Sequence, residues 1–150
     1  MMKADDLSGG SATAGGVVSG VWLMVRLAFR VLTTRVALHT LPLPSTIRLV
    51  TPRRSRQGQT RDQDAAENEL RLAQMMTGLL AGGNCLVRAL VGLRTLRRHG
   101  YDARLRFGVR KVGSELEAHA WLENEDGLCL DEAANAGGYV PLPPLVQRGR

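Results

Sequence analysis

Apolar residues recur at helical spacing in three stretches of the first hundred residues. The first stretch covers residues 16–39, and the apolar positions on one of its faces are Val17, Val21, Met24, Ala28 and Val31. A Pro-rich segment ends that stretch, because proline lacks an amide donor. The second stretch, residues 62–81, opens with acidic residues, which the helix dipole favours there. The third begins at or just before Cys85 and stops at Gly100, a residue typical of a left-handed helix cap. Three helices are therefore predicted.

After Gly100 the apolar period changes from 3.6 to 2. Residues 103–109 and 116–123 alternate apolar and polar side chains, as half-buried strands do. A turn signal at 124–127 precedes a return strand at 128–131. The pattern predicts an α+β fold, in which helices precede a small antiparallel sheet.

The chain of 150 residues is long enough for one domain with its own core. Residues 1–15 are small and polar and are expected to be a disordered lead-in. Residues 16–61 form a basic helix with a Pro/Arg-rich connector, and residues 62–150 form the core. The segment 16–61 contains eight arginines and no acidic residue. It is either a solvated surface or a docking face for a partner or a membrane, which would give the protein a peripheral membrane contact.

Composition narrows the choice of function. The net charge of +6 permits an acidic partner, but aromatic residues make up only 4%, and no nucleic-acid-binding module is recognisable, so nucleic acid is not expected as a partner. No export signal or spanning segment is visible, and two cysteines make no disulfide framework, so a reduced, cytoplasmic protein is expected. Neither Cys129 nor His99 has the spacing of metal ligands, and we expect no metal or other cofactor.

Three residues together suggest nucleophilic catalysis: Cys85 at a helix start, His119 within a strand and Asp131 on the next strand. Their types match a nucleophile, a base and a residue that orients the base. The positive end of the helix dipole favours a thiolate, and the first amides of the helix, including that of Leu86, are candidates for an oxyanion hole.

The hairpin register decides whether the base and its orienting residue meet. A three-residue loop, Glu125-Asp126-Gly127, puts His119 and Asp131 on the same face of the sheet, whereas a loop of two or four residues puts them on opposite faces.

Each of these residues also has a purely structural interpretation. Cys85 can be a small buried apolar residue, His119 a solvent-facing strand residue, and Asp131 a turn or cap residue. Asn84 can contribute its side-chain amide to an oxyanion hole, but a helix N-cap is the commoner role. Trp121 can line a substrate groove or pack in the core.

Two longer motifs resemble one family of enzymes. Residues 84–109 read NCLVRALVGLRTLRRHGYDARLRFGV and residues 116–123 read LEAHAWLE; Gly127, Leu130-Asp131-Glu132 and Tyr139 follow. Over about residues 62–142, the chain resembles the stand-alone transglutaminase-like leader peptidases of lasso-peptide biosynthesis.

The resemblance implies a papain- or transglutaminase-like core, in which Cys85 is the nucleophile, His119 the general base and acid, and Asp131 the histidine's orienting residue. The implied reaction removes the leader from a ribosomally made precursor peptide, so that a separate ATP-dependent cyclase can close the macrolactam. A separate leader-recognition protein is implied as a further partner. Two alternatives stay open: another transglutaminase-like acyl or amide transfer, and a basic interaction module without catalysis.

Overall fold

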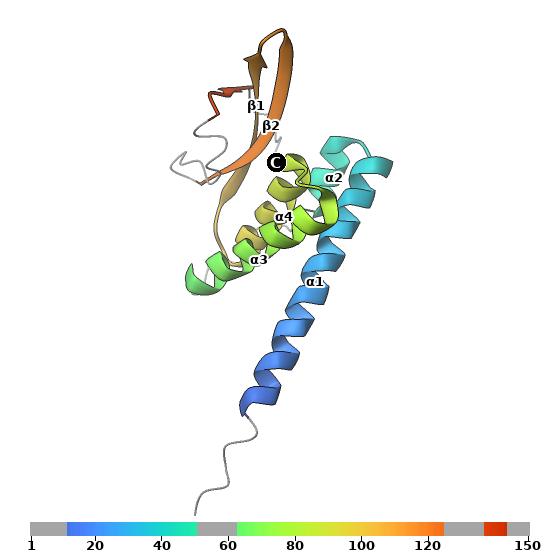
Figure 1. Cartoon of the computed structure of the whole chain (residues 1–150), viewed down its shortest axis with the longest axis vertical. Helices are drawn as coiled ribbons and strands as arrows, with labels where there is room; N and C mark the ends of the chain where they lie inside the picture. Colours follow the sequence, from blue (N-terminus) through green and yellow to red (C-terminus); the bar gives the residue numbers. More distant parts are fainter. Residues whose placement is uncertain (1–11, 51–62, 125–136, 144–150) are drawn as a thin grey trace, which may run out of the picture.

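A computed structural model describes residues 12–50, 63–124 and 137–143 of the chain. Its elements follow one another in the order α1 (Ala12–Thr40), α2 (Leu43–Val50), α3 (Gln63–Ala81), α4 (Cys85–Arg98), β1 (Ala103–Val112), β2 (Glu115–Asn124) and β3 (Val140–Pro141). The strands form an antiparallel sheet in the order β2-β1-β3. Four helices and a small sheet confirm the predicted α+β class (Figure 1).

The boundaries differ from the sequence pattern in two places. α1 begins at Ala12, inside the segment expected to be a disordered lead-in, and α2 lies within the Pro-rich exit, where no helix was predicted. Pro44 is tolerated there because it lies in the first turn, where its missing amide has no intrahelical acceptor.

The two long strands are joined by a tight hairpin. Val112 pairs with Glu115, which leaves only Gly113 and Ser114 in the turn, and Gly113 has a φ of 61°. A glycine with positive φ at the first turn position is typical of the II′ turn, whose twist matches that of the strands. The predicted return strand, residues 128–131, lies outside the described residues. The third strand is instead β3, which pairs with β1 in a tail expected to be irregular.

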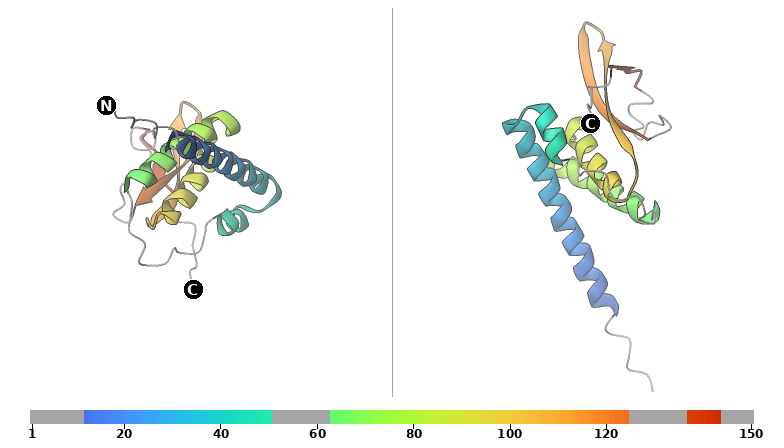
Figure 2. Two further views of the ribbon diagram at one scale, coloured as in Figure 1. Left: turned by 90° about the horizontal axis from the view of Figure 1, so that it is seen from below. Right: turned by 180° about the vertical axis from the view of Figure 1, so that it is seen from behind.

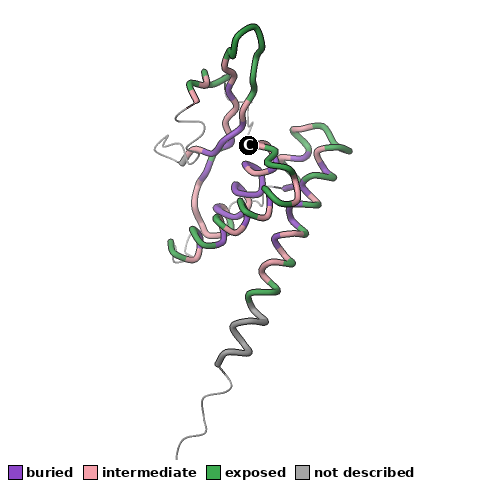
Figure 3. The backbone as a smooth tube through the Cα atoms, in the orientation of Figure 1, coloured by how far each residue is buried: buried purple, intermediate pink, exposed green. Residues whose placement is uncertain are grey.

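α4 is the central helix of the molecule. It contacts α1 and α3 on one side and β1 and β2 on the other, and the helices lie on one side of the sheet (Figure 2). Leu90 and Leu93 of α4 are fully buried. Figure 3 shows that the buried backbone follows α4, the middle of α1 and the parts of the strands beside the helices. The sheet therefore covers one flank of the helix that Cys85 begins.

The buried face of α1 matches the sequence prediction only in part. Val31 is fully buried as expected, whereas Val21, expected on the same face, is 58% exposed. The side chains that bury α1 are Leu27, Val31, Thr34 and Ala37. Arg30 is also inside, at 3% exposure, because a buried carboxylate on α3 binds it.

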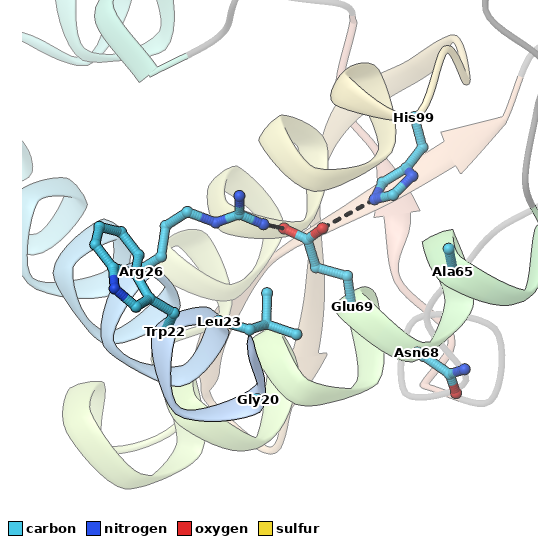
Figure 4. Close-up of a pocket in the computed structure, with 8 residues that line it drawn as sticks. All are labelled: Gly20, Trp22, Leu23, Arg26, Ala65, Asn68, Glu69 and His99. Carbon is cyan, nitrogen blue, oxygen red and sulfur yellow. Dashed lines mark hydrogen bonds and ion pairs between the residues drawn. The ribbon is translucent and has the colours of Figure 1, made fainter. Parts of the chain in front are cut away.

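That carboxylate is Glu69, and it joins three helices. Arg30 Nη1 lies 2.6 Å and Arg26 Nη2 3.4 Å from Glu69 Oε1, while His99 Nε2 at the end of α4 lies 2.9 Å from Oε2. Arg26, Glu69 and His99 border an open cavity of about 460 Å³ between α1 and α3 (Figure 4). We call Arg26, Arg30, Glu69 and His99 the Glu69 cluster.

The charges around Glu69 keep it ionised despite its burial. Burial by itself would raise the pKa of Glu69, but hydrogen bonds with His99 and Arg30 and the positive charges of Arg30 and Arg26 outweigh it, so the pKa lies below its usual 4.5. The cluster is consequently a source of stability only while the carboxylate is charged.

We expect Glu69→Gln to destabilise the fold by about 3–5 kcal/mol, because the guanidinium of Arg30 would stay buried without a counter-charge. Chemical denaturation followed by circular dichroism measures this loss. The matched control is Glu67→Gln on the exposed face of α3, which should change stability by no more than about 0.5 kcal/mol.

The same pair of variants tests the dependence on pH. Because the folded-state pKa of Glu69 is lowered, its contribution is present above about pH 4.5 and is lost as the pH falls toward the folded-state pKa. The difference in stability between the wild type and Glu69→Gln should therefore shrink in acid. A difference that stays constant from neutral pH to pH ~3 would contradict a charged Glu69.

Candidate active site

Cys85 is the first residue of α4 and follows a turn of two glycines. Gly82 and Gly83 have φ values of 60° and 74°, a left-handed conformation that favours glycine. Asn84 then caps the helix: its Oδ1 accepts hydrogen bonds from the backbone N–H of Leu86 at 3.0 Å and of Val87 at 3.2 Å. Cys85 is half-buried and packs against the apolar cluster between α4 and the sheet. The thiol therefore lies at the positive end of a well-formed helix.

The cap decides which amides are available to a ligand at this helix end. Asn84 takes up the N–H groups of Leu86 and Val87, so an oxyanion role for the Leu86 amide would have to displace the cap. The N–H of Cys85 itself is not one of the two that the cap uses. Of the two roles considered for Asn84, the N-cap is confirmed, and the cap binds the Leu86 amide that was an oxyanion candidate.

The register of the sheet separates Cys85 from His119. Leu122 and Ala120 pack with α4 in the core cluster that Cys85 borders. Strand alternation puts His119 on the other face of β2, so the sheet lies between the two side chains.

Leu122 is the side chain of β2 that meets α4, since a Cβ added at Gly92 would lie 3.0 Å from it. Trp121 and His119 share the other face of β2 by strand alternation. The exposure of β2 changes at His119, because Glu115 to Ala118 are exposed and Ala120 to Leu122 are buried. The tip of the hairpin projects beyond the helices (Figure 1).

His119 is held in a stack of rings. Its imidazole lies 5.0 Å from the Tyr139 ring, with an interplanar angle of 26°, and 6.3 Å from the Trp121 ring. The Arg110 guanidinium covers Tyr139 at 4.7 Å. The stack thus runs from a buried indole through the imidazole to a cation at the surface, and it limits the orientations of the His119 ring.

The outer end of the stack is anchored by ion pairing. Arg110 Nε donates to Glu117 Oε2 at 2.8 Å, and Arg110 Nη1 donates to Gly137 O at 3.1 Å. The hydrogen bond with Glu117 raises the pKa of Arg110 above its usual value. Tyr139 entered the sequence analysis only through the family motif. The spacing of polar residues gave no signal that it touches His119.

Trp121 is a buried ring that stacks next to His119. It is 5% exposed, its Nε1 donates to Glu123 Oε1 at 3.2 Å, and its ring covers Gly108 so closely that a Cβ there would lie 2.6 Å from a ring carbon. Of the two interpretations of Trp121, packing fits this burial. Gly108 is consequently a position where the sheet has no room for a side chain.

The remaining candidates fall partly outside the described residues. Asp131 and Cys129 both lie there, so the hairpin register that was to bring Asp131 beside His119 stays a prediction. Within residues 12–50, 63–124 and 137–143, no group of three or more His, Cys, Asp or Glu side chains is placed to hold a metal ion. A search of the described helices found none with the length and apolar character needed to cross a membrane.

A thiol at a helix N-terminus and an imidazole on a neighbouring strand are the side-chain types that cysteine-based acyl transfer uses. In the described structure the two lie on opposite faces of the sheet. No curated protein and no solved structure matches the chain. The model of the transglutaminase-like superfamily matches residues 23–143, which include every described element from the middle of α1 to β3. The chain belongs to the transglutaminase-like superfamily.

Proposed function

We propose that the protein is a cysteine peptidase that removes the leader from a ribosomally made lasso-peptide precursor. The observation that carries the peptidase chemistry is the position of the Cys85 thiol at the capped N-terminus of α4. The proposal requires the hairpin to bring His119 to this thiol. The family supports cysteine-based acyl chemistry in general.

The proposed substrate rests on the sequence motifs. The helix that starts Asn-Cys-Leu and ends Leu-Arg-Arg, the Ala-His-Ala-Trp strand and Tyr139 together resemble the leader peptidases of this pathway. The proposal therefore includes a separate leader-recognition protein and an ATP-dependent cyclase that uses the freed amine.

The proposed mechanism has two half-reactions. His119 takes the proton of the Cys85 thiol, and the thiolate adds to the carbonyl carbon of the last leader residue. As the carbon–nitrogen bond breaks, His119 returns a proton to the departing amine, which leaves as the new N-terminus of the core peptide. Water, deprotonated by His119, then hydrolyses the thioester and releases the leader as a carboxylic acid. In this proposal Asp131 orients the imidazole, and the Cys85 amide stabilises the oxyanion.

We expect Cys85→Ala to lower the rate of leader removal by at least about 1,000-fold, because it removes the atom that bonds to substrate. An intact-mass assay measures this with the purified protein, the precursor peptide and the recognition protein. The matched control is Cys129→Ala, which removes the chain's other thiol and should leave cleavage unchanged.

The product masses separate the remaining alternatives. For a hydrolase, the two products together exceed the precursor by one water, whereas a transferase supplied with a primary amine gives a leader that carries that amine. Equal cleavage by Cys85→Ala would contradict the assignment of the nucleophile. If neither protein cleaves while both are folded and all partners are present, the basic interaction module becomes the better explanation.

We expect Tyr139→Leu to lower kcat by about threefold to tenfold, because His119 loses the ring stacked against it. Tyr139→Phe keeps the ring and loses only the 3.4 Å hydrogen bond from the hydroxyl to Glu117, so it should retain nearly full activity. The same loss in both variants would show that the hydroxyl, and not the stacked ring, supports the reaction.

A further inference from the structure

The outward face of α1 is apolar. Figure 1 shows α1 at one edge of the molecule, and Figure 2 shows its outer side uncovered by any other described element. The large apolar side chains on that side are 48–70% exposed. We call them the α1 outer stripe: Val21, Trp22, Val25, Phe29, Leu32 and Val36.

The stripe is continuous along the helix. From Trp22 to Val36 its members are separated by three and four residues in alternation, the spacing of one helix face. It is about 20 Å long, because a helix rises 1.5 Å per residue. A contiguous apolar surface of this kind on a folded domain marks an interaction site.

The stripe itself carries no charge, and its surroundings are basic. Exposed Arg35 lies at its border, where its Nη1 also donates to the backbone oxygen of Leu80 at 2.8 Å, and exposed Arg48 follows on α2. Residues 7–61 contain no Asp or Glu, so no acidic side chain of this segment offsets them. Arg26 and Arg30 do not take part, because the Glu69 cluster holds them on the inner face.

We propose that the α1 outer stripe docks the protein on an anionic phospholipid surface, with α1 lying in the plane of the headgroups. An apolar helix face rich in aromatic and branched side chains and bordered by arginine is the combination that interfacial helices use. Trp22, at 70% exposure, is placed to enter the headgroup region, and Arg35 and Arg48 provide the attraction to negative charge.

Charge favours this occupant over a second copy of the chain. Two stripes packed together would bring the same basic borders against each other, with no acidic residue from 7–61 to pair them. A convex helix face also needs no matching groove on a lipid surface. The proposal is independent of the proposed peptidase activity, and its test does not use that activity.

The test is co-sedimentation of the full chain with vesicles of equal parts phosphatidylglycerol and phosphatidylcholine. We expect binding to these vesicles, weaker binding at high salt, and little binding to vesicles of phosphatidylcholine alone. Phe29→Ser with Leu32→Ser should weaken binding at least about tenfold, because it removes apolar area without adding charge. Trp22 emission should shift to shorter wavelength on binding, since Trp121 is already buried.

The matched control is Leu116→Ser, which removes a leucine that is 75% exposed, more than Leu32 or Phe29, from the projecting hairpin and should leave vesicle binding unchanged. Circular dichroism checks that all variants fold. No binding to the anionic vesicles would overturn the proposal, as would equal binding by the double variant or equal binding to neutral vesicles. A lipid-free dimer in sedimentation velocity that the double variant breaks would assign the stripe to a second copy instead.

Discussion

The orientation of the helices depends on one buried carboxylate. Glu69 on α3 binds Arg30 of α1 and His99 at the end of α4, so a single charged group joins the three longest helices. Its pairing determines which face of α1 enters the domain. Glu69 holds Arg30 on the inner face of α1 beside Leu27 and Val31, and a second apolar face of the helix is left outside. The core on this side is consequently mixed, with Leu27 and Val31 packed beside an ion pair.

The burial of Arg30 by Glu69 explains why the sequence predicted the second half of the chain better than the first. For α4 and the hairpin, periodicity, the Gly100 cap and strand alternation all agree with the packing, because the apolar residues of these elements are the buried ones. For α1, periodicity correctly indicated a helix but only part of its inward face. The deciding residue, Glu69, lies in another helix 39 positions away from Arg30, and no local pattern reports such a partner.

At the candidate site, too, the sequence pattern predicted the positions of residues better than their long-range contacts. Helix-start chemistry singled out Cys85 and Asn84, and strand alternation placed His119 and Trp121 on one face. The N-cap role of Asn84 could be predicted, because the bond that it makes with the Leu86 amide is local. The stacking of Tyr139 on His119 could not, because Tyr139 returns across β1 from a distant part of the chain. A contact between two rings that are far apart in sequence leaves no periodic pattern.

The short connection at Gly100 has a consequence for how the site is assembled during folding. Cys85 and His119 both belong to one helix–hairpin unit, Cys85–Asn124, whose parts meet through contacts between near neighbours in sequence. Low contact order of this kind favours early and rapid formation, since little loop-closure entropy is lost. Cys85 and His119 can thus reach their places within this unit before α1 docks through Glu69, and α1 would join a pair of elements that is already in register.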